Sequence, residues 1–251
     1  MMDKHIYIFN TQTDLNQAVA DHFAEIVNLS VKSRGVAYVA FSGGGTPQGF
    51  FQALAQPPYQ TSLPWIDIHV YWVDERSVPV DHPESNFGQV KKTLLDNAPI
   101  QLENIHRIHG ELNPENAATA YIKELITHAC SEHPWPKFDC TLLGLGEDGH
   151  TASLFPGQIN SSEQKLPVIA ITANYQGRPA NRVSLTPLIL NTSRNVAFMV
   201  SGANKARILS VVLNGPYDPV NLPAHRIQPV DGTITWLVDS SAAEIIINKE
   251  D

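Results

Sequence analysis

The sequence predicts an α/β fold, in which an open, mainly parallel sheet is covered by helices on both faces, in three layers. Apolar runs of strand length alternate with stretches in which apolar residues recur at helical spacing, from the first residues onward. Strands and helices that alternate in this way form a parallel sheet through right-handed crossovers. Several strand-like runs also end in glycine-rich or charged loops, and ligands bind at the carboxyl edge of such a sheet.

The first half of the chain supplies most of the expected sheet. In chain order we expect a strand at 5–9, a helix at 11–33, a strand at 36–41, a helix at 48–55, a strand at 66–73, helices at 86–95 and 114–130, and a strand at 138–145. In the first helix, Leu15 and Val19 begin an apolar face. Asn113 is the expected N-cap of the helix at 114–130, with Pro114 in its first position.

The second half continues the alternation with one interruption. We expect strands at 166–172, 183–185 and 195–200, a helix at 203–213, an extended surface connection at 216–229 and a last strand at 233–238. The connection is expected because it is rich in proline. Since neither an internal repeat nor a linker composition occurs, residues 1–251 are expected to form a single domain.

Composition and charge exclude several classes of function. The chain has 43% hydrophobic residues, a formal net charge of -8 and a pI near 5.6. Such a field repels nucleic acid and anionic membranes, so an anionic ligand needs a local cationic site. Cys130 and Cys140 lack the spacing of a disulfide framework or a cysteine-rich zinc site. No segment resembles a signal peptide or a membrane span, and we expect a cytoplasmic protein.

Residues 42–47, with the sequence SGGGTP, predict an anion site. They lie between a strand and a helix, where free backbone N–H groups and the positive end of the helix dipole face the same point. Glycines let a phosphate approach the main chain, and Ser42 and Thr46 add hydroxyl donors. The loop is neither a Walker A motif nor a dinucleotide-binding motif, because the required residues do not follow. A tight turn without a ligand is the alternative.

Two further strand ends carry charge. The first is residues 72–79, where the Arg76 guanidinium could bind a phosphate or a carboxylate. Asp74 could accept hydrogen bonds from sugar hydroxyls or orient a catalytic group. Glu75 is expected in a solvated turn. In residues 201–206, with the sequence SGANKA, Lys205 stands in the first turn of a helix. A cation is unfavourable there unless an anion lies nearby.

The most informative loop is GLGEDGHTASLFPG, residues 144–157. It places Asp148 and His150 directly after an apolar strand, and His150 titrates in the neutral range when unperturbed. The other histidines are expected to be surface or packing residues. His106 and His109 resemble a pair of metal ligands, but no third ligand accompanies them at a telling spacing, so no metal site is predicted.

These motifs, in this order, resemble the bacterial type of 6-phosphogluconolactonase. The resemblance covers nearly the whole chain, through SGGGTP, WVDERSVP, LLGLGEDGHTASLFPG, NRVSLT, VSGANKA and LPAHRIQPVDGTITWLVD, and DGHTASLFPG is its most specific part. It implies a Rossmann-like fold. Gly45 is a departure, because the family more often has Ser there, which removes a possible hydroxyl donor.

The same superfamily contains glucosamine-6-phosphate isomerases and deaminases, which share the glycine loop and the Asp-Gly-His core. Those enzymes continue with Asn-Glu-Pro, and the Glu takes part in acid-base chemistry. This chain has Leu154, Phe155 and Pro156 at those positions. Since a phenylalanine cannot carry a proton, the substitution favours the lactonase.

The resemblance implies hydrolysis of 6-phospho-D-glucono-1,5-lactone to 6-phosphogluconate in the oxidative pentose phosphate pathway, without a metal or organic cofactor. His150 would activate water, and either Asp148 or Asp74 would hold its tautomer. The expected substrate-binding residues are Ser42, Gly43, Gly44, Thr46, Asn86, Arg76, Arg182 and Lys205.

Two alternatives remain open from the sequence. One is a sugar-phosphate isomerase or deaminase, and the other is a sugar-phosphate sensor without turnover. Such sensors usually carry a nucleic-acid-binding module, and no basic helix is evident here. The expected partner is a phosphosugar lactone alone, with the protein a monomer or a weak homo-oligomer.

Overall fold

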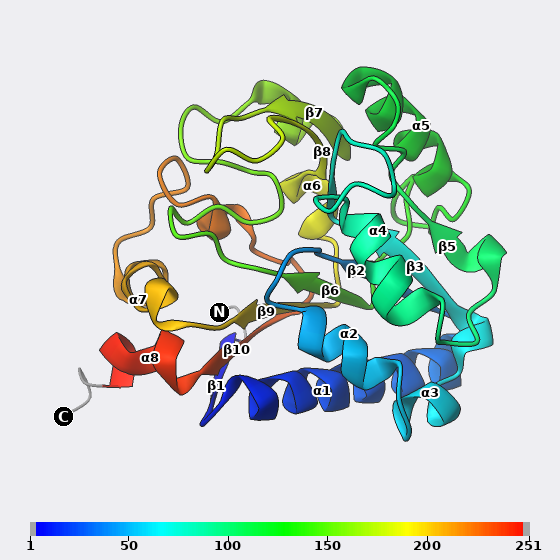
Figure 1. Cartoon of the computed structure of the whole chain (residues 1–251). Coiled ribbons are helices and arrows are strands. Elements are labelled where there is room, and N and C mark those ends of the chain that lie inside the picture. Colours follow the sequence, from blue (N-terminus) through cyan, green and yellow to red (C-terminus); the bar gives the residue numbers. More distant parts are fainter. Residues whose placement is uncertain (1–3, 248–251) are drawn as a thin grey trace.

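The computed structural model describes residues 4–247 and contains the predicted α/β fold (Figure 1). Seven parallel strands form the main sheet, in the spatial order β1-β10-β9-β6-β2-β3-β5. Their bounds are β1 (Lys4–Phe9), β10 (Thr233–Asp239), β9 (Asn195–Val200), β6 (Cys140–Leu143), β2 (Ala37–Phe41), β3 (Ile68–Trp72) and β5 (Ile105–His106). The inner strands are almost continuously buried, as expected for a sheet covered on both faces.

Helices cover both faces of this sheet. Their bounds are α1 (Gln12–Arg34), α2 (Gln48–Leu54), α3 (Tyr59–Ser62), α4 (Asn86–Val90), α5 (Pro114–Ile126), α6 (Pro187–Leu190), α7 (Ala206–Asn214) and α8 (Ser240–Ile247). In Figure 1, α1, α2 and α3 line one face, and α5 lies on the opposite side. None of the helices within residues 4–247 is both long enough and apolar enough to cross a membrane.

A cluster of aromatic rings fixes the start of α2. Phe41 ends β2, and its ring lies 5.3 Å from Phe51 and 6.0 Å from Phe50, both on α2. Phe23 of α1 completes the cluster, 5.7 Å from Phe41. All four side chains are buried. Because the glycine loop connects Phe41 to α2, this packing holds both of its ends.

A second, antiparallel sheet is the main departure from the sequence prediction. The expected strands at 166–172 and 183–185 become β7 (Val168–Thr172) and β8 (Asn181–Leu185), which do not join the main sheet. Instead β8 pairs with β7 on one side and with β4 (Asp74–Arg76) on the other. Strand periodicity does not say which strands pair, since pairing depends on contacts distant in sequence. The charged residues that follow β3 therefore form a strand of their own.

Other predictions need smaller corrections. Asn113 caps α5 as expected, but α5 ends at Ile126, and a 3₁₀ turn (Ala203–Lys205) precedes α7. The elements α3, α6, α8 and β5 were not expected; all are eight residues or shorter, so they give little periodicity. The connection at 216–229 is not simply a surface segment, because it contains a 3₁₀ turn (Pro223–Arg226) in which Arg226 is buried.

Candidate active site

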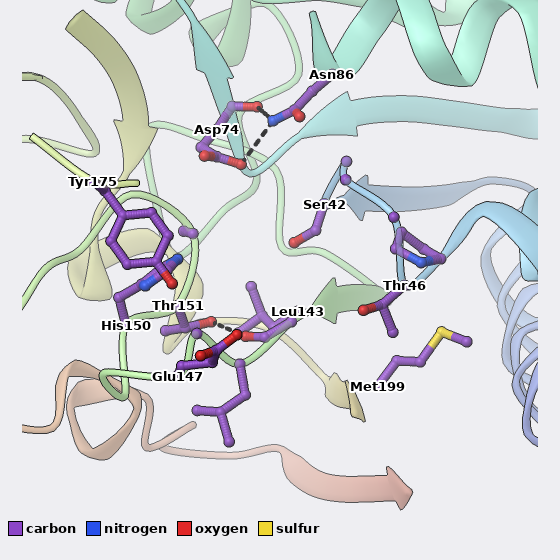
Figure 2. Close-up of a pocket in the computed structure, with 18 of the residues that line it drawn as sticks. Ser42, Thr46, Asp74, Asn86, Leu143, Glu147, His150, Thr151, Tyr175 and Met199 are labelled. Atoms are coloured by element: carbon purple, nitrogen blue, oxygen red, sulfur yellow. Dashed lines mark hydrogen bonds between the residues drawn. The ribbon is translucent and has the colours of Figure 1, made fainter. Parts of the chain in front are cut away.

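The predicted site residues meet at one pocket of about 320 Å³. It lies where the loops after β2, β3, β6 and β9 converge, at the carboxyl edge of the main sheet (Figure 2). Of the predicted residues, the following line it: Ser42, Gly43, Gly44, Thr46, Asp74, Arg76, Asn86, His150, Arg182 and Lys205. Asp148 does not line the pocket but lies behind His150.

The glycine loop approaches Asn86 closely. A Cβ atom at Gly43 would lie 2.2 Å from the Asn86 Oδ1 atom, so this position requires glycine, and Gly44 adopts a φ of 91°. The Ser42 Oγ atom and the Asn86 Oδ1 atom are buried and have no hydrogen-bond partner among the described residues. Buried polar atoms without partners are costly, so these two atoms are suited to bond with a ligand in the pocket.

Asp74 holds neighbouring loops together and does not contact His150. Its buried carboxylate accepts hydrogen bonds from the Ser153 hydroxyl at 2.6 Å and from the Asn86 amide at 3.1 Å. Asp148 is the residue that contacts His150. Of the two carboxylates left open by the sequence, the structure therefore pairs Asp148 with the histidine.

Glu75 was expected in a solvated turn, and that prediction is wrong. Its side chain is buried and accepts hydrogen bonds from the backbone N–H groups of Arg76, Asn86 and Phe87, and from the Ser85 hydroxyl. Burial raises the pKa of Glu75 to about 7, against the opposing effect of the backbone hydrogen bonds. The carboxyl group thus holds the start of α4, and with it Asn86.

Two buried arginines form a cationic wall. Arg76 and Arg182 are directly opposite in the β4–β8 ladder, and both side chains are buried. The Arg76 Nη1 atom donates to the Glu84 carbonyl at 2.8 Å and lies 3.1 Å from the Glu84 carboxylate. The Nε atom of Arg76, and the Nε and Nη2 atoms of Arg182, have no partner within the described chain. Burial lowers the pKa of Arg182, and the negative charge of Asp74 partly offsets this shift.

Lys205 extends the cationic wall from a different loop. Burial lowers its pKa, and the carboxylates of Glu147 and Asp148 oppose this shift. Asp239 holds the loop, because it accepts hydrogen bonds from the Ser201 hydroxyl and from the Gly202 N–H group. The lysine lies in the 3₁₀ turn before α7, close to its predicted position in the first turn.

The lining residues that the sequence did not predict include Glu147, Tyr175 and Arg178. The last two come from the tight connection between β7 and β8, where Gln176 and Gly177 both have positive φ angles. A glycine between two expected strands is a turn signal, and Gly177 is a sequence feature that indicates this turn. Arg178 is 41% exposed and lies 3.8 Å from the Glu84 carboxylate, so its side chain adds a partly exposed cation at the pocket rim.

His150 is oriented by its neighbour in sequence. The His150 Nδ1 atom lies 2.6 Å from the Asp148 Oδ1 atom, which leaves Nε2 as the ring nitrogen for chemistry. Burial by itself would raise the pKa of Asp148. The hydrogen bonds and charge interaction with His150 together have the larger effect, so the pKa of Asp148 is lowered. A Cβ atom at Gly146 would lie 2.0 Å from the histidine ring, so only glycine permits this arrangement.

Two aromatic rings enclose the histidine. Phe155 and Tyr175 each lie 4.7 Å from the His150 ring, between centroids. The Arg182 guanidinium lies 5.3 Å from the Phe155 centroid, so the Phe155 ring contacts both His150 and the cationic wall. The site thus combines a carboxylate-paired histidine with buried guanidinium nitrogens that have no hydrogen-bond partner among the described residues, as expected in an α/β enzyme for a small anionic substrate.

Comparison with known proteins identifies the family. The family model described as glucosamine-6-phosphate isomerases/6-phosphogluconolactonase matches residues 10–236. The 6-phosphogluconolactonase of Synechocystis sp. is 39% identical over 222 residues, which cover 87% of this chain and 88% of the relative. That of Haemophilus influenzae is 36% identical over 209 residues, covering 83% and 87%. The solved 6-phosphogluconolactonase of Trypanosoma brucei is 26% identical, with a TM-score of 0.84 over 98% of this chain and 100% of that one. This chain belongs to the glucosamine-6-phosphate isomerase/6-phosphogluconolactonase family.

The buried Glu75 provides a test of how the site is held. Glu75→Ala leaves three backbone N–H groups without an acceptor, and each buried group left unpaired costs about 1–3 kcal/mol. We expect the free energy of unfolding, measured with urea, to fall by at least that amount. Glu103→Ala, an exposed control, should change it by less than about 0.5 kcal/mol.

The same pair of proteins tests the titration of Glu75. Because its pKa rises from 4.5 to about 7 on folding, the folded chain binds the proton more tightly than the unfolded chain between these values. The stability difference between wild type and Glu75→Ala should therefore decrease as the pH rises through this window. A difference that grows with pH would contradict the assignment.

Proposed function

We propose that this protein hydrolyses 6-phospho-D-glucono-1,5-lactone to 6-phospho-D-gluconate, the second step of the oxidative pentose phosphate pathway. The observation that carries the proposal is a histidine held by Asp148, in a pocket whose other walls hold buried guanidinium nitrogens without partners. The names of the curated relatives agree with it. The proposed enzyme consists of one domain, acts as a monomer or weak homo-oligomer in the cytoplasm, and needs no cofactor.

The phosphate of the substrate is the proposed partner of the cationic wall. A phosphate accepts hydrogen bonds from a guanidinium fork, and Arg76, Arg182 and Lys205 bring their charges to one pocket. The glycine loop adds Ser42, Gly43, Gly44 and Thr46 to the phosphate contacts, and Asn86 adds a buried amide. The phosphate is held at a distance from the reacting carbonyl, and this contact orients the lactone. Binding energy at the phosphate thus positions the carbonyl carbon for attack by water.

His150 is the proposed general base. Its neutral Nε2 atom takes a proton from water as the water oxygen attacks the lactone carbonyl carbon. The tetrahedral intermediate then collapses, the bond between the carbonyl carbon and the ring oxygen breaks, and the imidazolium returns the proton to that oxygen. One water is consumed and a carboxylic acid forms, which ionises. Asp148 would hold the Nδ1–H tautomer and stabilise the imidazolium between the two steps.

Phe155 supports hydrolysis over isomerisation or deamination. Those reactions need a second acid-base group, which the related enzymes supply from a Glu at this position. Here the position holds an aromatic ring packed against His150 and Arg182. The ring cannot exchange protons, and it shields the histidine from solvent, which suits a single base that acts on one bound water.

His150→Ala tests the base. We expect kcat to fall by a factor of about 10² or more, with KM little changed, because a general base acts on the chemical step. Rates must be measured above the spontaneous hydrolysis of the lactone, and glucosamine 6-phosphate should be turned over by neither protein. Equal kcat in mutant and wild type would remove His150 from the mechanism. Binding of 6-phosphogluconate without any turnover by the wild type would favour a sensor.

Asp148→Asn tests the pairing of the carboxylate with the histidine. An amide does not stabilise the imidazolium, so we expect kcat to fall by about 10² or more. Because both residues act as one unit, Asp148→Asn combined with His150→Ala should be no slower than His150→Ala alone. Asp231→Asn, on an exposed residue, is the control and should leave kcat unchanged. Additive losses in the double variant would contradict the pairing.

Lys205→Ala and Arg182→Lys test the phosphate anchor. A lost charged hydrogen bond costs about 1.5–3 kcal/mol, so kcat/KM for the phosphorylated lactone should fall by about 10- to 100-fold. The value for unphosphorylated D-glucono-1,5-lactone should change little, which reduces discrimination between the two. Lys165→Ala removes an exposed lysine as a control. If both substrates lose activity equally, the phosphate is held elsewhere.

A further inference from the structure

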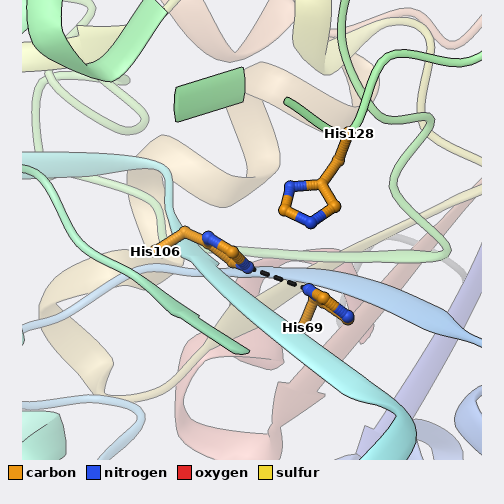
Figure 3. A group of neighbouring side chains, drawn as sticks. All are labelled: His69, His106 and His128. Atoms are coloured by element: carbon orange, nitrogen blue, oxygen red, sulfur yellow. Dashed lines mark hydrogen bonds between the residues drawn. The ribbon is translucent and has the colours of Figure 1, made fainter. Parts of the chain in front are cut away.

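Three histidines that are distant in sequence meet beside β3, β5 and the end of α5 (Figure 3). His69 belongs to β3, His106 to β5, and His128 follows the end of α5. One ring nitrogen from each lies within 4.8 Å of the other two. His109, which the sequence pairs with His106, lies outside the group; its side chain is 46% exposed and contacts Glu111. None of the three lines the active-site pocket.

We propose that His69, His106 and His128 bind one divalent transition-metal ion of the zinc class. The contacts of each ring identify the ligand atoms. The His106 Nδ1 atom bonds to the Glu124 carboxylate at 2.6 Å, and the His128 Nδ1 atom bonds to the Tyr71 hydroxyl at 2.9 Å. The Nε2 atoms of both rings are thus the ligands. His69 contributes Nδ1, which lies 2.9 Å from the His106 Nε2 atom.

The spacing of the His69 and His106 nitrogens is close to what such an ion requires, and the His128 nitrogen lies within 4.8 Å of both. Imidazole nitrogens bind zinc at about 2.0–2.1 Å, so two of them at tetrahedral positions lie roughly 3.3 Å apart. The His69 and His106 nitrogens need to separate by only a few tenths of an ångström. In Figure 3 a nitrogen of the His128 ring faces this pair. Imidazole ligands suit zinc, copper and nickel and do not suit calcium or magnesium.

The groups around the histidines are those that orient metal ligands. A carboxylate on the second ring nitrogen fixes the tautomer, and Glu124 takes that position at His106; at His128 the second ring nitrogen contacts the Tyr71 hydroxyl, which orients the ring. The Tyr71 ring also stacks on His106, at 4.3 Å between centroids. Burial and the neighbouring histidines lower the pKa of His69 to about 4, and burial lowers the pKa of the other two. The rings are therefore neutral at neutral pH, as metal ligands must be.

Metal binding requires only one proton to move. Without metal, the His69 Nδ1 atom and the His106 Nε2 atom share a hydrogen bond, and one of the two must be the donor. With Glu124 accepting the Nδ1 proton of His106, that hydrogen belongs to His69. On metal binding it moves to the His69 Nε2 atom, and no proton is released. The ion would join β3, β5 and the chain after α5, which gives it a structural role away from the pocket.

Cobalt titration of the chelator-treated full chain tests this site. We expect one Co²⁺ per chain, with the visible absorption of a four-coordinate ion, displacement by Zn²⁺, and a higher Tm with Zn²⁺. His128→Gln should weaken binding by about 10-fold or more, as should Glu124→Gln, which keeps all three ligands. His109→Gln and His150→Ala are the controls and should bind as the wild type does.

Two outcomes would overturn the proposal. One is the absence of saturable Co²⁺ or Zn²⁺ binding by the wild type, which would make the group a neutral packing cluster. The other is equal binding by wild type, His128→Gln and Glu124→Gln. Circular dichroism of each variant shows whether it is folded. If His128→Gln does not fold, the Co²⁺ affinity of Glu124→Gln tests the site. None of these readouts depends on lactone hydrolysis.

Discussion

The buried carboxylate of Asp74 is the contact on which the pocket depends. Its two oxygens accept hydrogen bonds from Ser153, in the loop of His150, and from Asn86, at the start of α4. Asn86 in turn packs against Gly43 of the glycine loop. The Asp74 carboxylate thus fixes the position of the His150 loop relative to the glycine loop. Burying a carboxylate is costly, and the hydrogen bonds to both oxygens, with Arg182 nearby, offset that cost.

The pocket is cationic within an acidic protein. The chain carries a formal net charge of -8, yet Arg76, Arg182 and Lys205 converge on one pocket. Burial lowers the pKa of both Arg182 and Lys205, because desolvation disfavours their charged forms. A bound dianion would relieve this cost. The same arrangement would disfavour an uncharged ligand, since such a ligand would leave the buried guanidinium nitrogens without partners.

The proline-rich connection near the C-terminus also shapes the site. Arg226 forms a buried ion pair with Glu163 and donates a hydrogen bond to the carbonyl oxygen of Phe155 at 3.3 Å. Phe155 packs against His150, so this ion pair supports the aromatic wall around the proposed base. A segment expected to be an extended surface connection is therefore linked to the site through one arginine.

The sequence by itself determined the fold class, most strands of the main sheet and the four loops that converge on the pocket. These follow from local features: apolar periodicity, glycine loops and charges at strand ends, all of which lie within a few residues of one another. Only the tertiary structure decided that Asp148 and not Asp74 pairs with His150, that Glu75 is buried, and that β4, β7 and β8 form a separate sheet. It also brought His69, His106 and His128 together. Such contacts depend on which strands and loops pack side by side, and local sequence does not encode that choice.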